Sequence, residues 1–68
     1  MQIRLNGEPY DLPDDREATL AMLVEARGLT GRRLAIEVNG DLVPRGEHAR
    51  HVLAPGDRVE IVQAIGGG

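Results

Sequence analysis

Residues 34–43 read LAIEVNGDLV and carry the clearest strand–turn–strand pattern of this 68-residue sequence. Apolar residues occupy alternate positions from Leu34 to Val38, which is typical of a β-strand with one buried face. Asn39-Gly40 follows, and both residue types tolerate the positive φ that a tight hairpin turn requires. We therefore predict a strand, a turn, and a short returning strand over Asp41–Val43 that Pro44 ends.

Both ends of the chain carry further strand patterns. Gln2–Leu5 alternates polar and apolar residues, Asn6-Gly7 can form a type I′ turn, and Glu8–Leu12 is predicted to be the returning strand. A last strand is predicted after the turn Pro55-Gly56-Asp57. Its inner face carries Val59 and Ile61, and the strand is expected to run to about Ala64.

A single helix is predicted between the hairpins. Its apolar stripe falls at i, i+3 and i+4 and consists of Leu20, Leu23 and Val24. We expect Asp14 or Asp15 to cap its first turn, because a carboxylate can accept hydrogen bonds from the free amides there. Gly28 is placed to end the helix in the left-handed conformation, with Leu29 packing back onto the last turn.

The order of elements, ββαββ, predicts an α+β fold. One helix would lie across one face of a mixed four- to five-stranded sheet, which satisfies the need for two packed layers. In this arrangement the first and last strands commonly pair in parallel at the sheet centre, although periodicity alone does not require it. The predicted core consists of Ile3, Leu5, Leu20, Leu23, Leu34, Ile36, Val38, Val59 and Ile61.

Composition excludes several classes of function. The chain has no cysteine and no serine, so it offers no thiolate or serine nucleophile and no cysteine ligands for a metal or iron–sulfur cluster. A net charge of −3 and a single aromatic residue, Tyr10, argue against nucleic-acid binding. No apolar run is long enough to span a membrane, and nothing resembles a secretory signal. We expect a soluble cytoplasmic protein that is not itself an enzyme.

The best candidate for chemistry is the end of the sequence. We expect a domain over residues 1–65 and a flexible glycine tail over Gly66, Gly67 and Gly68. Without side chains, such a tail can enter a narrow channel and present its terminal carboxylate for attachment of AMP, which sulfur or an amine could then displace. The alternative is a frayed end or a remnant of cloning, and the compact domain before the tail favours the first interpretation.

Other polar groups are interpreted as surface features. His48 and His51 are spaced i, i+3, but two imidazoles are too few for a closed zinc site, so no metal is expected. Arg32-Arg33 could meet an acidic partner, although a solvated loop is the simpler interpretation.

The last strand also predicts a docking surface. With Val59 and Ile61 inward, Val62 and Ala64 point outward and lead to Ile65 and the tail. We expect Val62, Ala64 and Ile65 to contact a partner, with scattered surface hydrophobes as the alternative.

These residues together resemble a known family. The opening Met1-Gln2-Ile3, the turn Asn6-Gly7, Val43-Pro44-Arg45, Pro55-Gly56-Asp57 and the ending Ala64-Ile65-Gly66-Gly67-Gly68 resemble the ThiS family of sulfur carriers in thiamin biosynthesis. The resemblance covers the whole chain. Gly67 and Gly68 match the terminal pair of the family, and Gly66 is an additional glycine.

The resemblance implies a ubiquitin-like β-grasp fold, a function and partners. An E1-like adenylyltransferase (ThiF) would use ATP and magnesium to convert the Gly68 carboxylate to an acyl-adenylate, so the carrier itself would bind no cofactor. A sulfur donor such as a cysteine desulfurase would then give a thiocarboxylate. Thiazole synthase (ThiG) would take the sulfur to build the thiazole ring. Three alternatives remain open: the small subunit of molybdopterin synthase, a carrier for tRNA thiolation or another sulfur pathway, and a non-covalent β-grasp binding module.

Overall fold

The structure, a computed structural model, describes residues 1–63. Its elements follow the predicted order and are β1 (Gln2–Leu5), β2 (Glu8–Asp11), α1 (Leu20–Ala26), β3 (Leu34–Val38), β4 (Asp41–Leu42), the 3₁₀ turn η1 (Arg45–Glu47) and β5 (Arg58–Gln63). The expected continuation of the last strand to Ala64 lies outside the described residues. The same is true of the boundary between a domain over 1–65 and a tail over 66–68.

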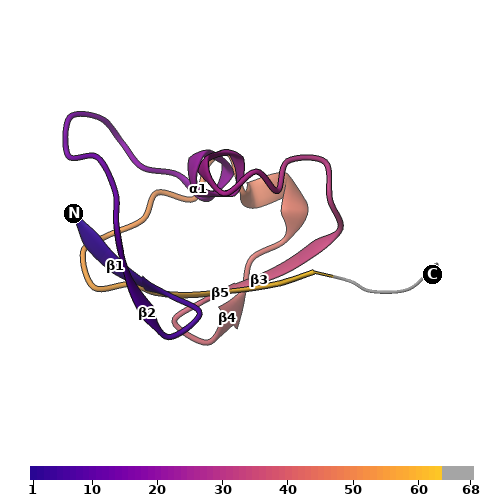
Figure 1. The fold of residues 1–68 in the computed structure, drawn as a ribbon. Helices are drawn as coiled ribbons and strands as arrows, with labels where there is room; N and C mark the ends of the chain where they lie inside the picture. Colours follow the sequence, from indigo (N-terminus) through magenta and orange to yellow (C-terminus); the bar gives the residue numbers. More distant parts are fainter. Residues whose placement is uncertain (64–68) are drawn as a thin grey trace.

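The strands form one mixed sheet in the order β2-β1-β5-β3-β4. The two hairpins, β1–β2 and β3–β4, are antiparallel, and β5 lies between them. β5 is parallel to β1 and antiparallel to β3. Figure 1 shows α1 and η1 on the same side of this sheet. Within residues 1–63, five strands with one helix across one face confirm the β-grasp prediction, and β1 and β5 form the parallel pair that is common in this arrangement.

Both predicted hairpin turns adopt the left-handed backbone that their sequences favour. φ is +51° at Asn6 and +84° at Gly7, and it is +54° at Asn39 and +89° at Gly40. Two consecutive positive φ angles are the mark of a type I′ turn, whose twist matches that of the flanking strands.

The helix begins later than predicted. Its N-cap is Thr19, whose Oγ1 accepts a hydrogen bond from the backbone N–H of Met22 at 3.2 Å. The prediction that Asp14 or Asp15 caps the helix is therefore wrong. Residues 14–16 form a bend, and Thr19 has an extended backbone and forms a β-bridge with Val52. Asp14 instead lies 2.6 Å from the amino group of Met1, and this hydrogen-bonded contact raises the pKa of that amine.

The end of the helix agrees with its prediction. Gly28 has φ of +70°, and its N–H donates to the carbonyl of Glu25. The N–H of Leu29 donates to the carbonyl of Val24 at 2.9 Å. These two bonds are those of a Schellman motif, and Leu29 packs against the core as that motif favours.

The core lies between α1 and the sheet. Ile3, Leu20, Leu23, Ile36 and Val59 are its largest fully buried side chains, and all five were predicted. Two predicted members, Leu34 and Ile61, are only partly buried and pack against its border. Among residues 1–63, five buried residues are absent from the predicted core. Val24 belongs to the predicted helix stripe, and the other four lie in loops or at strand ends, where no periodicity marks them: Leu12, Ala18, Val43 and Leu53.

Candidate functional site at the end of β5

β5 leads directly to the glycines at the end of the sequence. It pairs with β3 over five positions, from Val38↔Val59 to Leu34↔Gln63. On its other side it pairs with β1 at Arg4↔Arg58 and Leu5↔Val59. β5 is thus paired on both sides at Arg58 and Val59, and β3 alone pairs with it as far as Gln63. The predicted tail residues Gly66, Gly67 and Gly68 lie outside the described residues.

The outward face of β5 is as predicted. Val59 is 1% exposed, whereas Val62 is 62% exposed on the face of the sheet opposite α1. Ala35 is the cross-strand neighbour of Val62. Leu42, 67% exposed, pairs with Glu37 and shares that face. We call Ala35, Leu42 and Val62 the open-face patch.

The open-face patch differs in part from the predicted docking surface. Val62 belongs to both, whereas Ala64 and Ile65 lie outside the described residues. Leu42 was missed, because a strand of only two residues shows no alternation from which its outward side could be read.

Charged residues of one sign stand side by side on the rest of this face. Arg4 pairs with Arg58 across β1 and β5, and Glu37 pairs with Glu60 across β3 and β5. Within residues 1–63 no ion pair involves any of the four. Along β5 the face is therefore basic at Arg58, acidic at Glu60 and apolar at Val62. Like charges directly opposite one another weaken a sheet, so this face is not arranged for stability alone.

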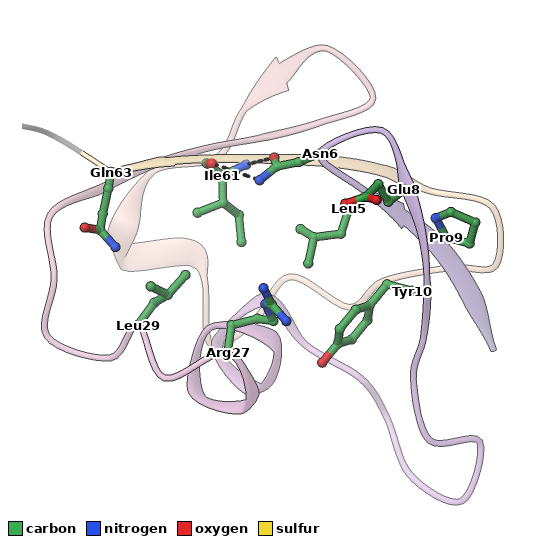
Figure 2. A pocket seen from close by; sticks show the side chains of 9 residues that line it. All are labelled: Leu5, Asn6, Glu8, Pro9, Tyr10, Arg27, Leu29, Ile61 and Gln63. Atoms are coloured by element: carbon green, nitrogen blue, oxygen red, sulfur yellow. Dashed lines mark hydrogen bonds between the residues drawn. The ribbon is translucent and has the colours of Figure 1, made fainter.

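A groove lies on the opposite, helix-facing side of β5. It has a volume of about 510 Å³, and its lining includes Ile61 and Gln63 of β5 and Arg27 and Leu29 at the end of α1. Figure 2 shows Ile61 and Gln63 pointing from β5 toward α1. The guanidinium of Arg27 lies 5.7 Å from the centre of the Tyr10 ring, a cation–π contact.

Asn6 holds β5 near its end. Its side-chain Oδ1 accepts a hydrogen bond from the N–H of Ile61 at 2.8 Å, and its Nδ2 donates to the carbonyl of Ile61 at 3.3 Å (Figure 2). Sequence analysis identified Asn6 only as a turn residue.

Two of the remaining candidates, His48 and Arg32, contact other residues of the domain. One ring nitrogen of His48, Nε2, lies 3.1 Å from the carbonyl oxygen of Val43, so it can form a hydrogen bond within the domain. Arg32 Nη1 lies 3.5 Å from Oε1 of Gln63. In the described part of the chain, no three histidine, cysteine or acidic residues gather as metal ligands. The described helices include none long and apolar enough to cross a membrane.

The sequence is similar to a known protein family and to several of its relatives. The model of the ThiS family matches residues 3–68. A thiazole synthase of Magnetococcus marinus is 38% identical over 68 residues, and an uncharacterized protein, ycf40, of Porphyra purpurea is 31% identical over 68 residues. This chain is covered fully in both alignments, and it spans 20% of the synthase and 93% of the ycf40 protein.

A solved structure is similar over its whole length. The crystal structure of a thiamine biosynthesis protein (ThiS) from Geobacter metallireducens superposes with a TM-score of 0.83 at 25% identity, covering both chains completely.

Proposed function

The chain belongs to the ThiS family, and we propose on that basis that it is a sulfur carrier of thiamin biosynthesis whose reactive group is the carboxylate of Gly68. The observation that carries the proposal is the family match, which runs to residue 68 and so includes all three final glycines. The described structure supports it by giving those glycines a firmly paired strand to start from. The sequence contains neither cysteine nor serine, so neither of these nucleophiles competes with the terminal carboxylate.

The proposed chemistry has three steps. In the active site of an E1-like adenylyltransferase (ThiF), the Gly68 carboxylate attacks the α-phosphorus of ATP, and pyrophosphate leaves. ATP and magnesium belong to that enzyme. A sulfur nucleophile from a donor such as a cysteine desulfurase then attacks the carbonyl carbon, and AMP leaves with the bonding electron pair. With a persulfide donor this gives an acyl disulfide. A thiol from outside this chain then attacks the donor's sulfur, so that a disulfide forms between thiol and donor and the thiocarboxylate at Gly68 leaves. The carrier supplies the carboxylate, and glycine residues suit a narrow active-site channel because they have no side chain.

Thiazole synthase (ThiG) is the proposed sulfur acceptor. In the Magnetococcus thiazole synthase, a segment similar to this whole chain is part of one polypeptide five times as long. Covalent linkage of two activities keeps them at a high effective concentration, which is useful where one serves the other. This arrangement in a relative supports a separate thiazole synthase as the partner of this chain.

The open-face patch is the proposed docking surface for the adenylyltransferase. Val62 and Leu42 are more than half exposed, and large apolar side chains in such a position favour contact with another protein. Val62 also lies only six residues before Gly68, so an enzyme that covers it is close to the reactive end. Ala64 and Ile65, which continue from Val62, are proposed to extend this contact.

The proposal is tested by ATP–pyrophosphate exchange with the cognate adenylyltransferase. We compare the parent with a protein lacking Gly68 and with one extended by a residue after Gly68. A residue spans about 3.3–3.6 Å, and a displacement of about 1 Å can already cost on the order of 10²-fold in rate. Both variants are therefore expected to lose exchange by at least that factor.

Both variants should unfold at the temperature of the parent, because residues 1–63 and the core they contain are unchanged. Exchange by the Gly68-deleted protein at the rate of the parent would show that Gly68 is not the activated residue.

A further inference from the structure

Two asparagines bind β5 through their side-chain amides, Asn39 at its first residue and Asn6 at Ile61, two residues before its last. Each is the first residue of an Asn-Gly hairpin turn, with φ of +51° at Asn6 and +54° at Asn39. The Oδ1 of Asn39 accepts from the N–H of Arg58 at 2.9 Å, and its Nδ2 donates to Asp57 at 3.0 Å. The corresponding atoms of Asn6 bind the N–H and the carbonyl of Ile61. The turns of the two hairpins thus contact the strand between them at Arg58 and at Ile61.

The side chain of Asn6 binds β5 beyond the last residue that pairs with the backbone of β1. β1 follows β5 up to Leu5↔Val59, and the N–H of Asn6 donates to the carbonyl of Val59 at 2.8 Å. The chain then turns back into β2, although β5 continues to Gln63. A side-chain amide has the donor and the acceptor of a peptide unit, so Asn6 adds one further rung to the ladder, at Ile61. Aspartate lacks the donor, and glycine lacks both groups.

We infer that Asn6 is a positioning residue. Its side-chain amide determines where the contacts of β5 on its β1 side end. It thereby positions the strand from which the residues leading to Gly68 continue. The inference rests on the proposed function. With the Asn6 rung present, β5 is held on both sides up to Ile61. Without it, the last contact on that side is at Val59, and residues 60–63 are held by β3 alone, so the enzyme has a less rigidly held strand end to position.

The expected effect is on binding of the carrier more than on the chemical step. Fixing the backbone of one residue costs the equivalent of roughly 5–30-fold in an equilibrium constant. The KM for the carrier should therefore rise by about that factor when the rung is removed. The kcat should stay within about twofold, because the carboxylate, once seated, is the same group in the same place.

The test compares Asn6→Gly with Asn39→Gly, since glycine keeps the positive φ of each turn and removes only the side-chain amide. Hydrogen exchange should lose protection at the Ile61 amide in Asn6→Gly and at the Arg58 amide in Asn39→Gly. In ATP–pyrophosphate exchange, only Asn6→Gly should raise the KM. Asn6→Asp, which keeps the acceptor, should retain part of the protection at Ile61 and fall between the parent and Asn6→Gly.

Two results would overturn the inference. One is an equal rise in KM in both glycine variants, which would mean that loss of stability rather than position is responsible. The other is an unchanged KM in Asn6→Gly despite lost protection at Ile61. If the parent supports no exchange at all, the proposed function fails. The inference is then judged by hydrogen exchange alone, and retained protection at Ile61 in Asn6→Gly overturns it.

Discussion

Replacing Val62 by aspartate should weaken binding to the adenylyltransferase and leave the fold intact. The Val62 side chain is 62% exposed, so most of its surface is still available for contact. Complete burial of a valine is worth about 1.5 kcal/mol, so covering the exposed part contributes roughly 1 kcal/mol to binding. An aspartate loses this contribution, and burying its polar group costs about a further 1–3 kcal/mol. The expected loss is about 2–4 kcal/mol, or roughly 30- to 1,000-fold in Kd.

The assay is titration calorimetry of the carrier with the adenylyltransferase, with thermal unfolding of each variant as a check on the fold. Val52→Asp is the matched control, because Val52 is 49% exposed and lies beside Thr19 at the start of α1, away from the open-face patch. It should bind within about twofold of the parent. The docking argument is refuted if Val62→Asp binds like the parent, or if both substitutions weaken binding equally.

Two further predictions concern the fold. Leu23→Ala should cost about 2–5 kcal/mol in the free energy of unfolding, because Leu23 is fully buried between α1 and the sheet, whereas Glu25→Ala on the exposed side of α1 should change it by less than about 0.5 kcal/mol. Chemical denaturation measures both, and a loss at Leu23 as small as that at Glu25 would contradict the core. Thr19→Ala should cost about 0.5–2 kcal/mol through the lost cap, and Asp15→Ala clearly less; the reverse order would show that the helix begins earlier than Thr19.

Local features of the fold were predictable where one or two residues determine the conformation. Asn39-Gly40 and Gly28 adopt positive φ because other residue types would be strained there, so their turns and caps could be predicted from sequence. The alternation in β3 likewise fixed which side faces the core. The helix start was not predictable in this way, because Asp14, Asp15 and Thr19 are all good capping residues. The choice depends on the bridge between Thr19 and Val52, which no local pattern reveals.

The features of the candidate site likewise differ in whether local sequence or tertiary structure determines them. The outward position of Val62 follows from the two-residue period of a strand, and it was predicted. The exposure of Leu42 depends on its partner in β3, and the contact of Asn6 with Ile61 joins residues 55 positions apart. Both are results of tertiary structure.

The position of β5 has a consequence for how the protein is made. The strand at the centre of the sheet is the last of the described elements to leave the ribosome. Until it is present, the hairpins β1–β2 and β3–β4 have no common partner, and an isolated hairpin is only marginally stable. A nascent or prematurely ended chain that lacks residues 58–63 therefore cannot complete the sheet. Because that same strand leads to Gly68, only chains translated nearly to the proposed reactive residue can complete the sheet and present the proposed docking surface.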